Sequence, residues 1–241
     1  MMYSKEQFTE KLLRELSSAG LEAFSHSAEK LYTVVSRLDE FGKKFNLTAI
    51  TDPDQVIKKH LIDCLFAAKQ IPLPEGKTLI DIGAGAGFPS LPVSAALPSL
   101  HVTALDSTAK KVNYMNDTAK AAGITNFTAV CARAEEYALP YRETFDFATA
   151  RAVASLPVLC ELCIPYVKIG GKFIAMKGAA AEEETEEAKN AAKKLGCAPA
   201  EILPYSLPGM EDKRFLIIYT KISPTPEAFP RNFSQISKKP L

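Results

Sequence analysis

The chain of 241 residues contains no tryptophan, three histidines and five cysteines, and its formal net charge is only +1. Because 29 basic residues are balanced by 28 acidic ones, a protein that binds polyanions over its whole surface is excluded. Any site for nucleic acid must therefore be a local patch of positive charge. The cysteines are odd in number and scattered along the chain, which is typical of reduced thiols and indicates a cytoplasmic protein.

Long apolar runs are also missing. The longest uncharged stretch, residues 82–100, contains three glycines and three prolines, so it does not predict a membrane-spanning helix. The first residues carry a mixed-charge helical pattern instead of the apolar centre of a secretory signal. With 47% hydrophobic and 24% charged residues, the composition is that of a globular protein, and the length fits one large domain or one domain with an extension.

The first third of the chain has the periodicity of amphipathic helices. Its apolar residues recur at intervals of three and four, with a break expected in residues 46–53. Pro72 and Pro74 end the helical pattern. We therefore expect residues 1–70 to form a helical extension that packs on a core domain of residues 71–241.

The remainder of the chain alternates between short apolar runs and helical segments. This order is typical of a parallel sheet covered by helices on both faces, and so of an α/β fold. The last two predicted strands are joined by residues 204–209, a connection too short for a helical crossover, so these strands should be antiparallel. We predict seven strands: Thr78–Ile82, Val102–Leu105, Asn126–Val130, Phe145–Ala150, Lys172–Met176, Ala200–Tyr205 and Phe215–Lys221.

The most informative segment is a glycine-rich loop that follows the first predicted strand. It reads Asp81-Ile82-Gly83-Ala84-Gly85-Ala86-Gly87-Phe88-Pro89. Glycines at alternate positions let a ligand approach the backbone closely, and Asp81 can accept hydrogen bonds from a ligand or from loop amides. A dinucleotide site would need glycine or alanine in place of Phe88, so that helix and strand pack closely around a pyrophosphate.

A second acidic residue supports a nucleoside ligand. Asp106 ends the next predicted strand, 19 residues after Gly87, where a carboxylate can accept hydrogen bonds from both hydroxyls of a ribose. A nucleoside without a pyrophosphate fits both Asp106 and Phe88, and S-adenosylmethionine is the common ligand of that description. The alternative is a tight glycine turn that serves packing alone.

The glycine-rich loop resembles the first motif of class I methyltransferases, and nearly the whole chain resembles the RsmG (GidB) family. That family methylates N7 of a guanine in the 16S ribosomal RNA of bacteria. Outside the loop, the resemblance rests on Leu91-Pro92, Asp106-Ser107, Lys110-Lys111, Arg133-Ala134-Glu135, Ala150-Arg151-Ala152, Lys177-Gly178, Phe45-Asn46-Leu47-Thr48, His60, Asp63 and the tail from Pro230-Arg231 to Pro240-Leu241.

The resemblance implies a Rossmann-like class I methyltransferase fold, with an antiparallel last strand in a seven-stranded, mostly parallel sheet. It also implies S-adenosylmethionine as cofactor, 16S ribosomal RNA or the small-subunit particle as partner, and the guanine at nucleotide 527 as methyl acceptor. By position, the resemblance implies that Gly83 and Phe88 contact the methionine and sugar of the cofactor. It implies that Ala134 and Glu135 border the adenine, and that Arg151 closes the cofactor pocket.

Asp106 as the ribose acceptor follows from the general fold rather than from the family. We expect Arg151 to matter for turnover more than for folding, because it follows a buried strand at the ligand-binding end of the sheet. One departure from the family is Cys64, where the resemblance implies serine after Asp63. This departure argues against a catalytic hydroxyl at that position.

Features of other methyltransferases are missing. The fourth predicted strand leads into Thr149-Ala150-Arg151-Ala152, and not into the Pro-Pro-aromatic motif of enzymes that methylate exocyclic amines. No Pro-Cys or Thr-Cys dipeptide offers a nucleophile for pyrimidine C5. Guanine N7 carries a free lone pair and no proton, so positioning supplies most of the acceleration. We therefore assign no catalytic base and no metal ligand.

Two further motifs have competing interpretations. His60 either faces the RNA or the cofactor, or forms a hydrogen-bonded pair with Asp63 three residues later on a helix. Cys160 and Cys163 form a CxxC motif, but no second pair and no nearby histidine accompany them. Buried helical thiols are therefore the preferred interpretation of these cysteines.

Positive charge is concentrated in doublets and in the C-terminal tail. Basic charge in the tail can hold phosphates while its two aromatic residues, Phe229 and Phe233, stack on exposed bases. Alternatively, these aromatic residues fasten the tail to the sheet. The doublets are Lys43-Lys44, Lys58-Lys59, Lys110-Lys111 and Lys238-Lys239, and the tail cations are Lys221, Arg231, Lys238 and Lys239.

Three functions are compatible with these patterns. A ribosomal RNA methyltransferase predicts a basic surface around the cofactor, a small-molecule methyltransferase predicts an enclosed apolar pocket with a lid, and a non-catalytic nucleoside-binding module predicts binding without turnover. The family resemblance favours the first. It also leads us to expect a cytoplasmic monomer with no membrane association.

Overall fold

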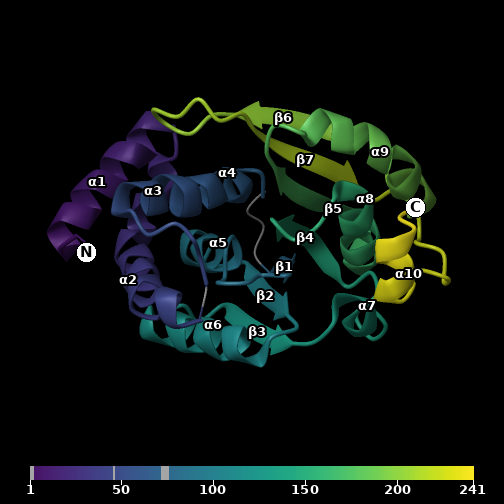
Figure 1. The fold of residues 1–241 in the computed structure, drawn as a ribbon, viewed down its shortest axis with the longest axis horizontal. Coiled ribbons are helices and arrows are strands. Elements are labelled where there is room, and N and C mark those ends of the chain that lie inside the picture. The colour runs from purple at the N-terminus through teal and green to yellow at the C-terminus, as the bar shows by residue number, and fades with distance from the viewer. Residues whose placement is uncertain (1–2, 46, 72–75) are drawn as a thin grey trace.

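The computed structural model describes residues 3–45, 47–71 and 76–241 (Figure 1). At the centre of these residues is a seven-stranded sheet with the order β3-β2-β1-β4-β5-β7-β6. Strands β1 to β5 are parallel, and β7 is antiparallel to both of its neighbours. The predicted α/β fold and its antiparallel last strand are therefore confirmed. The strands are Thr78–Ile82 (β1), His101–Asp106 (β2), Phe127–Cys131 (β3), Phe145–Arg151 (β4), Val167–Lys177 (β5), Glu201–Tyr205 (β6) and Arg214–Thr220 (β7).

Helices cover both faces of the sheet (Figure 1). The adjacent residues Leu79 and Ile80 of β1 point to opposite faces and belong to two separate hydrophobic clusters. The first cluster includes buried residues of α1, α2, α4, α5 and α6, and the second includes those of α8, α9 and α10. The α-helices are Lys5–Ser18 (α1), Ala28–Phe45 (α2), Pro53–Val56 (α3), Asp63–Lys69 (α4), Ser90–Ala96 (α5), Ala109–Ala121 (α6), Ala134–Tyr137 (α7), Leu156–Cys163 (α8), Ala181–Lys194 (α9) and Phe233–Lys238 (α10), with 3₁₀ turns at Glu22–Ser27 (η1) and Ile164–Tyr166 (η3) and a π-helical turn at Ile57–Ile62 (η2).

The N-terminal helices follow the predicted apolar period. Helix α1 begins at a capping box, in which the Ser4 hydroxyl accepts from the amide of Gln7 and the Gln7 side chain accepts from the amide of Ser4. Its inward stripe is fully buried and packs in the first cluster. Pro72 and Pro74, predicted to end this region, lie outside the described residues, as does Asn46.

Strand β5 begins at Val167, five residues before the predicted start at Lys172, whereas every other strand end lies within one residue of its prediction. The adjacent Gly170 and Gly171 both lie inside the strand. A Cβ on Gly171 would lie 2.5 Å from the carbonyl oxygen of Asp146 on β4. Glycine therefore marks a close approach of two backbones here rather than a break.

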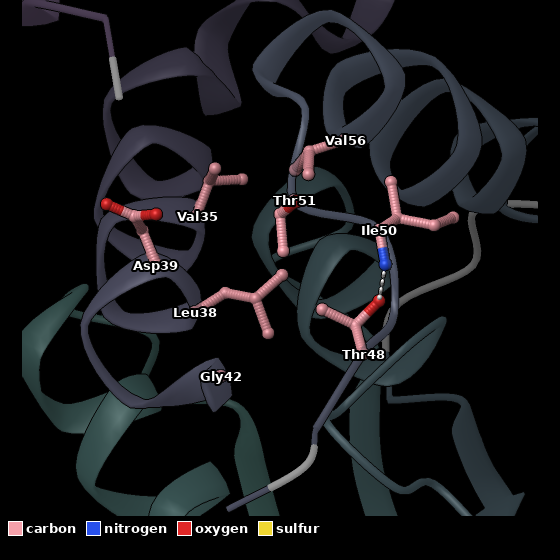
Figure 2. A pocket seen from close by; sticks show the side chains of 8 residues that line it. All are labelled: Val35, Leu38, Asp39, Gly42, Thr48, Ile50, Thr51 and Val56. Atoms are coloured by element: carbon pink, nitrogen blue, oxygen red, sulfur yellow. Dashed lines mark hydrogen bonds between the residues drawn. The ribbon is translucent and has the colours of Figure 1, made fainter. Parts of the chain in front are cut away.

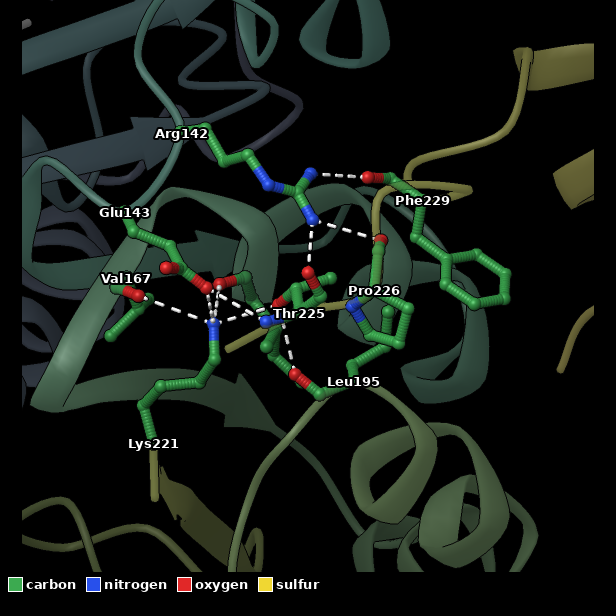
Figure 3. Close-up of polar contacts among 9 residues, drawn as sticks. Arg142, Glu143, Val167, Leu195, Lys221, Thr225, Pro226 and Phe229 are labelled. Carbon is green, nitrogen blue, oxygen red and sulfur yellow. Dashed lines mark hydrogen bonds and ion pairs between the residues drawn. The ribbon is translucent and has the colours of Figure 1, made fainter. Parts of the chain in front are cut away.

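The C-terminal tail is fastened to the body of the protein by buried polar contacts (Figure 3). Lys221, which follows β7, is only 1% exposed and donates to Glu143 Oε1 at 3.1 Å and to Thr225 Oγ1 at 2.7 Å. The neighbouring Arg142 donates to three carbonyl oxygens of the tail, those of Thr225, Pro226 and Phe229. Lys221 is therefore a structural cation and not a phosphate contact.

A second ion pair holds the end of the tail. Glu161 of α8 is fully buried and accepts from the backbone amide and from Nε of Arg231, both at 2.8 Å. Phe229 is buried in the second hydrophobic cluster, which confirms the interpretation that this ring fastens the tail. Of the four tail cations, Lys238 and Lys239 remain exposed and available to a phosphate.

Candidate functional site

The glycine-rich loop leaves β1 at the carboxyl edge of the sheet and turns back onto the end of β2. The amides of Gly83 and Ala84 donate to the carbonyl oxygen of Leu105 at 2.8 and 3.0 Å. Gly83 has φ +70°, and a Cβ there would lie 2.7 Å from the Val153 side chain. Both the backbone conformation and the available space therefore require glycine at this position.

Asp106 lies beside this loop at the end of β2 and is 7% exposed. Its carboxylate accepts from the amides of Gly85 at 3.0 Å and Thr108 at 2.9 Å, and Lys111 Nζ lies 3.8 Å away. A carboxylate offers about four acceptor positions, so about two remain for the hydroxyls of a ligand. The side chain is thus fixed in place without being saturated.

A pocket, which we name the first pocket, opens over the ends of β1, β2 and β3. It contains four of the six residues expected to contact the cofactor: Gly83, Asp106, Ala134 and Glu135. Three elements that are distant in sequence complete its wall: the loop after β4, α8 and α10 contribute Val153, Leu162 and Phe233, respectively. No sequence pattern pointed to the first two, and Phe233 was noted only as an aromatic residue of the basic tail.

The other two expected residues, Phe88 and Arg151, are not among those that line the first pocket. Arg151 lines a neighbouring cavity, the second pocket, over the ends of β4 and β5. The consecutive residues Ala152 and Val153 line the second and the first pocket, respectively. Both pockets lie at the carboxyl edge around β1 and β4, where the strand order reverses and open α/β sheets bind their ligands.

One buried carboxylate organises the second pocket. Asp63 is 1% exposed, and its Oδ1 accepts from the Tyr205 hydroxyl at 2.7 Å. Its Oδ2 accepts from Arg151 Nη1 and from Arg214 Nη1, each at 3.2 Å. Burial, together with the neighbouring Asp63 carboxylate, raises the pKa of Tyr205, so the phenol stays a neutral donor. Lys177 also lines this pocket, which makes it rich in positive charge.

His60 stacks on Phe88, with 4.7 Å between the ring centroids and 22° between the planes. Arg151 Nη2 lies 3.2 Å from His60 Nδ1, and Thr48 Oγ1 lies 2.9 Å from His60 Nε2. A guanidinium can only donate, so Nδ1 accepts and the proton is on Nε2. Burial, with Arg151 and Arg214 nearby, lowers the pKa of His60 to about 3. His60 is therefore neutral, and Arg151 bridges it to Asp63 in place of the direct pair considered above.

The backbone around His60 forms a π-helical turn. The amide of Asp63 donates to the carbonyl oxygen of Lys58, five residues earlier. The next carbonyl, that of Lys59, accepts from Arg151 Nη1 at 2.9 Å. Such turns are frequent at functional sites because they re-aim side chains and backbone groups within a helix. Here the turn presents one carbonyl and one imidazole to the same arginine.

Thr48 links this turn to the segment after α2. Its hydroxyl accepts from the amide of Ile50 at 3.0 Å, at the edge of a small pocket that this segment shares with α2 and Val56 (Figure 2). The same hydroxyl has a second lone pair to accept from His60 Nε2. Thr48, which the sequence places in a motif shared with the family, thus helps to position the His60 imidazole through this hydrogen bond.

Asp81 is fully buried beneath the glycine-rich loop. Its Oδ2 accepts from the amide of Ser90 at 3.2 Å, while its Oδ1 has no hydrogen-bond partner among the described residues. Burial raises the pKa of Asp81 to about 6. The carboxyl group therefore joins the end of β1 to the start of α5, which fixes the position of the loop between them.

The cysteines do not form a metal site in the part of the chain that the structure describes. Cys160 and Cys163 are both fully buried in α8, and burial raises the pKa of both thiols. This confirms the interpretation of buried helical thiols. Across residues 3–45, 47–71 and 76–241, no cluster of histidine, cysteine and acidic side chains is placed to hold a metal ion, and no helix is long and apolar enough to cross a membrane.

The basic doublets differ in their surroundings. Lys58 lies 3.5 Å from Glu15, and Lys59 lies 3.7 Å from Asp212, so both take part in ion pairs. Lys110 is exposed, whereas Lys111 lies 3.8 Å from Asp106. The side chains of the doublet Lys43-Lys44 lie outside the described residues.

The chain is similar to known proteins over nearly its full length. The profile of a family described as "GidB: rRNA small subunit methyltransferase G" matches residues 27–208. A protein named "Ribosomal RNA small subunit methyltransferase G" from Clostridium botulinum strain Eklund 17B is 41% identical over 237 residues, which cover 98% of this chain and 99% of that protein. A protein of the same name from Oceanobacillus iheyensis is 40% identical over 234 residues, which cover 96% and 98%.

Solved structures share the fold at much lower sequence identity. A SAM-dependent O-methyltransferase from Thermotoga maritima superposes with a TM-score of 0.56 at 17% identity, covering 79% of this chain and 73% of that chain. At this level of identity the likeness concerns the fold alone. It confirms the Rossmann-like class I methyltransferase fold expected from the glycine-rich loop and the strand order.

Proposed function

The chain belongs to the rRNA small subunit methyltransferase G family, and from this premise we propose that it transfers a methyl group from S-adenosylmethionine to guanine N7 of 16S ribosomal RNA. The observation that carries the proposal is the pair of pockets at one edge of the sheet, joined by consecutive residues of the loop after β4. One pocket has the groups that suit a nucleoside, and the other has the positive charge that suits a nucleotide of RNA.

The first pocket fits the cofactor. Asp106 is held by two backbone amides and keeps acceptor positions for the ribose hydroxyls. Because Gly83 has no Cβ, a ligand in the pocket can approach its backbone closely. We propose that Gly83 borders the methionine and sugar, and that Ala134 and Glu135 border the adenine. Arg151, which lines the second pocket, and Phe88, whose ring stacks on His60, stay proposed contacts.

The cofactor, when bound, supplies an electrophilic methyl group on a sulfonium centre. Guanine N7 needs no deprotonation before it accepts this group, so the protein's contribution is placement. The state of His60 supports this view, because both of its ring nitrogens are engaged and its pKa is lowered to about 3. A group in that state is unsuited to remove a proton at neutral pH.

The second pocket suits the acceptor nucleotide. Proteins usually contact guanine through a bidentate arginine at O6 and N7, but N7 must stay free to accept the methyl group. Arg151 and Arg214 would therefore contact O6 or a phosphate instead, and Asp63 holds both guanidinium groups for that purpose. Lys177 adds charge at the same edge, although Glu184 pairs with it at 2.6 Å.

The test is methyl transfer with S-adenosylmethionine that carries a labelled methyl group. The acceptors are naked 16S RNA, small-subunit particles and a small-molecule extract of cells, each tested separately. N7-methylguanine has a labile glycosidic bond, so borohydride–aniline cleavage should locate the label, which we expect at nucleotide 527. Label on an exocyclic amine or a pyrimidine carbon would contradict the chemistry, and label only in a small metabolite would favour the small-molecule alternative.

We also propose that residues 1–70 are an extension of a methyltransferase core formed by residues 71–241. The shared hydrophobic cluster of α1, α2 and α4 with α5 and α6 supports a closely packed extension. The proposed reaction places the protein in the cytoplasm with the ribosomal RNA, where we expect it to act as a monomer. Light scattering of the purified protein, with and without RNA, measures the oligomeric state.

A further inference from the structure

The C-terminal tail returns to the edge of the sheet where the first pocket opens. Helix α10 lies beside α8 in this region (Figure 1). Phe233, the first residue of α10, lines the first pocket together with Asp106, Ala134 and Glu135. Among the described residues that line the pocket, it is the only aromatic one. The tail therefore contributes directly to the site proposed for the cofactor.

The exposure of Phe233 is unusual for its position in the helix. Residues three apart lie on the same face of a helix, and Ile236 on that face is completely buried in the second cluster. Phe233 points toward the protein in the same way, yet it is 40% exposed. The ring lines the first pocket and is only partly covered by the protein. Part of its apolar surface is thus available to a ligand in that pocket.

The backbone that carries Phe233 is held firmly on both sides. The preceding residue, Asn232, caps α10 by accepting from the amide of Gln235 at 3.0 Å. The residue before that, Arg231, is paired with Glu161, whose neighbour in α8, Leu162, also lines the first pocket. The contacts of Lys221 and Arg142 hold the tail further upstream (Figure 3). The backbone that carries the ring is therefore fixed by contacts of the neighbouring residues.

We propose that Phe233 is a cofactor-binding residue whose ring packs on the adenine of S-adenosylmethionine, so that the C-terminal tail completes the cofactor pocket. An aromatic ring has the flat apolar face that a purine stacks on, and such stacking strengthens binding without requiring a particular base sequence. This inference rests on the proposed function, because it concerns the same cofactor. It assigns the tail a role in the pocket that is separate from any contact with RNA.

The absence of tryptophan from the chain gives a direct test. F233W introduces a single indole, whose fluorescence should change on titration with S-adenosylhomocysteine and should report the same dissociation constant as calorimetry. Adenosine should give the same change, whereas free methionine should give none. An indole that does not respond at saturating ligand would overturn the inference.

Calorimetry on further variants measures the effect on affinity. F233A should raise the dissociation constant for S-adenosylhomocysteine by about tenfold, with F233W close to wild type. The control is I222A, a truncation of an exposed tail residue outside the first pocket. Melting of the ligand-free proteins should be unchanged, since Phe233 is partly exposed. Equal affinity of F233A and wild type would overturn this inference but leave the proposed function intact. A wild-type protein that binds neither S-adenosylmethionine nor S-adenosylhomocysteine would overturn the proposed function.

Discussion

At the scale of single residues, Asp81 and His60 are buried titratable groups with opposite responses to pH. Burial raises the pKa of Asp81 from 3.8 to about 6. Burial, with Arg151 and Arg214, lowers the pKa of His60 from 6.5 to about 3. The native state thus retains a proton on Asp81 that the unfolded state loses, and lacks a proton on His60 that the unfolded state gains. Asp81 therefore lowers the free energy of unfolding as the pH rises from about 4 through 6. His60 lowers the free energy of unfolding as the pH falls below 6.5.

We expect Asp81→Asn to stabilise the protein increasingly as the pH rises. At pH 7.5 the wild-type native state buries an ionised carboxylate, whereas the amide is neutral and can still accept from Ser90. The advantage of the variant in free energy of unfolding should grow by about 2 kcal/mol between pH 4 and pH 7.5, as measured by urea denaturation. A difference that stays constant over this range would mean that Asp81 titrates normally. His60→Gln is the contrast, since its difference from wild type should change below pH 6.5 instead.

A second prediction at this scale concerns Asp106. Asp106→Ala should weaken the binding of S-adenosylmethionine by about 1–3 kcal/mol, because the ribose hydroxyls lose their acceptor. Isothermal titration calorimetry measures the effect, and Asp117→Ala, at an exposed position of α6, is the matched control. An affinity equal to wild type would remove the ribose assignment. The variant also loses the hydrogen bonds from the Gly85 and Thr108 amides. The melting temperature of the ligand-free variant shows whether this loss destabilises the protein, independently of the loss of cofactor affinity.

At the scale of secondary-structure elements, one carboxylate connects four segments. Asp63 begins α4, and its partners Arg151, Tyr205 and Arg214 belong to β4, β6 and β7. The guanidinium of Arg151 also donates to η2 through the Lys59 carbonyl. The sequence predicts that Arg151 matters for turnover more than for folding. Because its guanidinium holds Asp63 and η2 together, we now expect Arg151→Ala to lower both stability and methyl transfer.

Asp63→Asn should destabilise the protein by about 3 kcal/mol. It leaves two largely buried guanidinium groups without their counter-charge, and removing one partner of such a buried pair is costly. Urea denaturation at pH 7.5 measures the loss, with Asp54→Asn as control because Asp54 forms an ion pair that is half exposed. A loss below about 1 kcal/mol, similar to a surface pair, would contradict the central role of Asp63.

The elements differ in how far the sequence determines them. Most strands are apolar runs bounded by turn residues, so their ends are predicted within one residue. The early start of β5 depends on contact between Gly171 and the backbone at Asp146, which no local pattern records. The π-helical turn at His60 and the cluster around Asp63 depend on Arg151 and on strands far along the chain. Local patterns therefore pointed to the glycine-rich loop and to Asp106, and the family resemblance pointed to residues of both pockets. How these residues divide between two pockets emerges only from the folded topology.

At the scale of the whole molecule, a net charge of +1 requires that RNA be held by local groups. The sequence presents the C-terminal tail as one basic and aromatic unit, but the fold divides it. Lys221 and Arg231 form ion pairs with Glu143 and Glu161, respectively, whereas Lys238 and Lys239 are exposed. The division of the chain at residue 70 stays a prediction, because residues 72–75 lie outside the described parts.

This division determines which charges should affect RNA binding. Replacing Lys238 and Lys239 by glutamine should lower the slope of log affinity against log salt by about 1.4, since each phosphate contact to single-stranded RNA contributes about 0.7. Arg231 is left in place, because removing it would release Glu161 and disturb the backbone that carries Phe233. The control replaces Lys189 and Lys193, which are exposed on α9 and line neither pocket. Filter binding to 16S RNA at several salt concentrations measures the slopes, and calorimetry should find cofactor affinity unchanged. If both double variants flatten the slope equally, the attraction is general, and the tail has no particular contact with RNA.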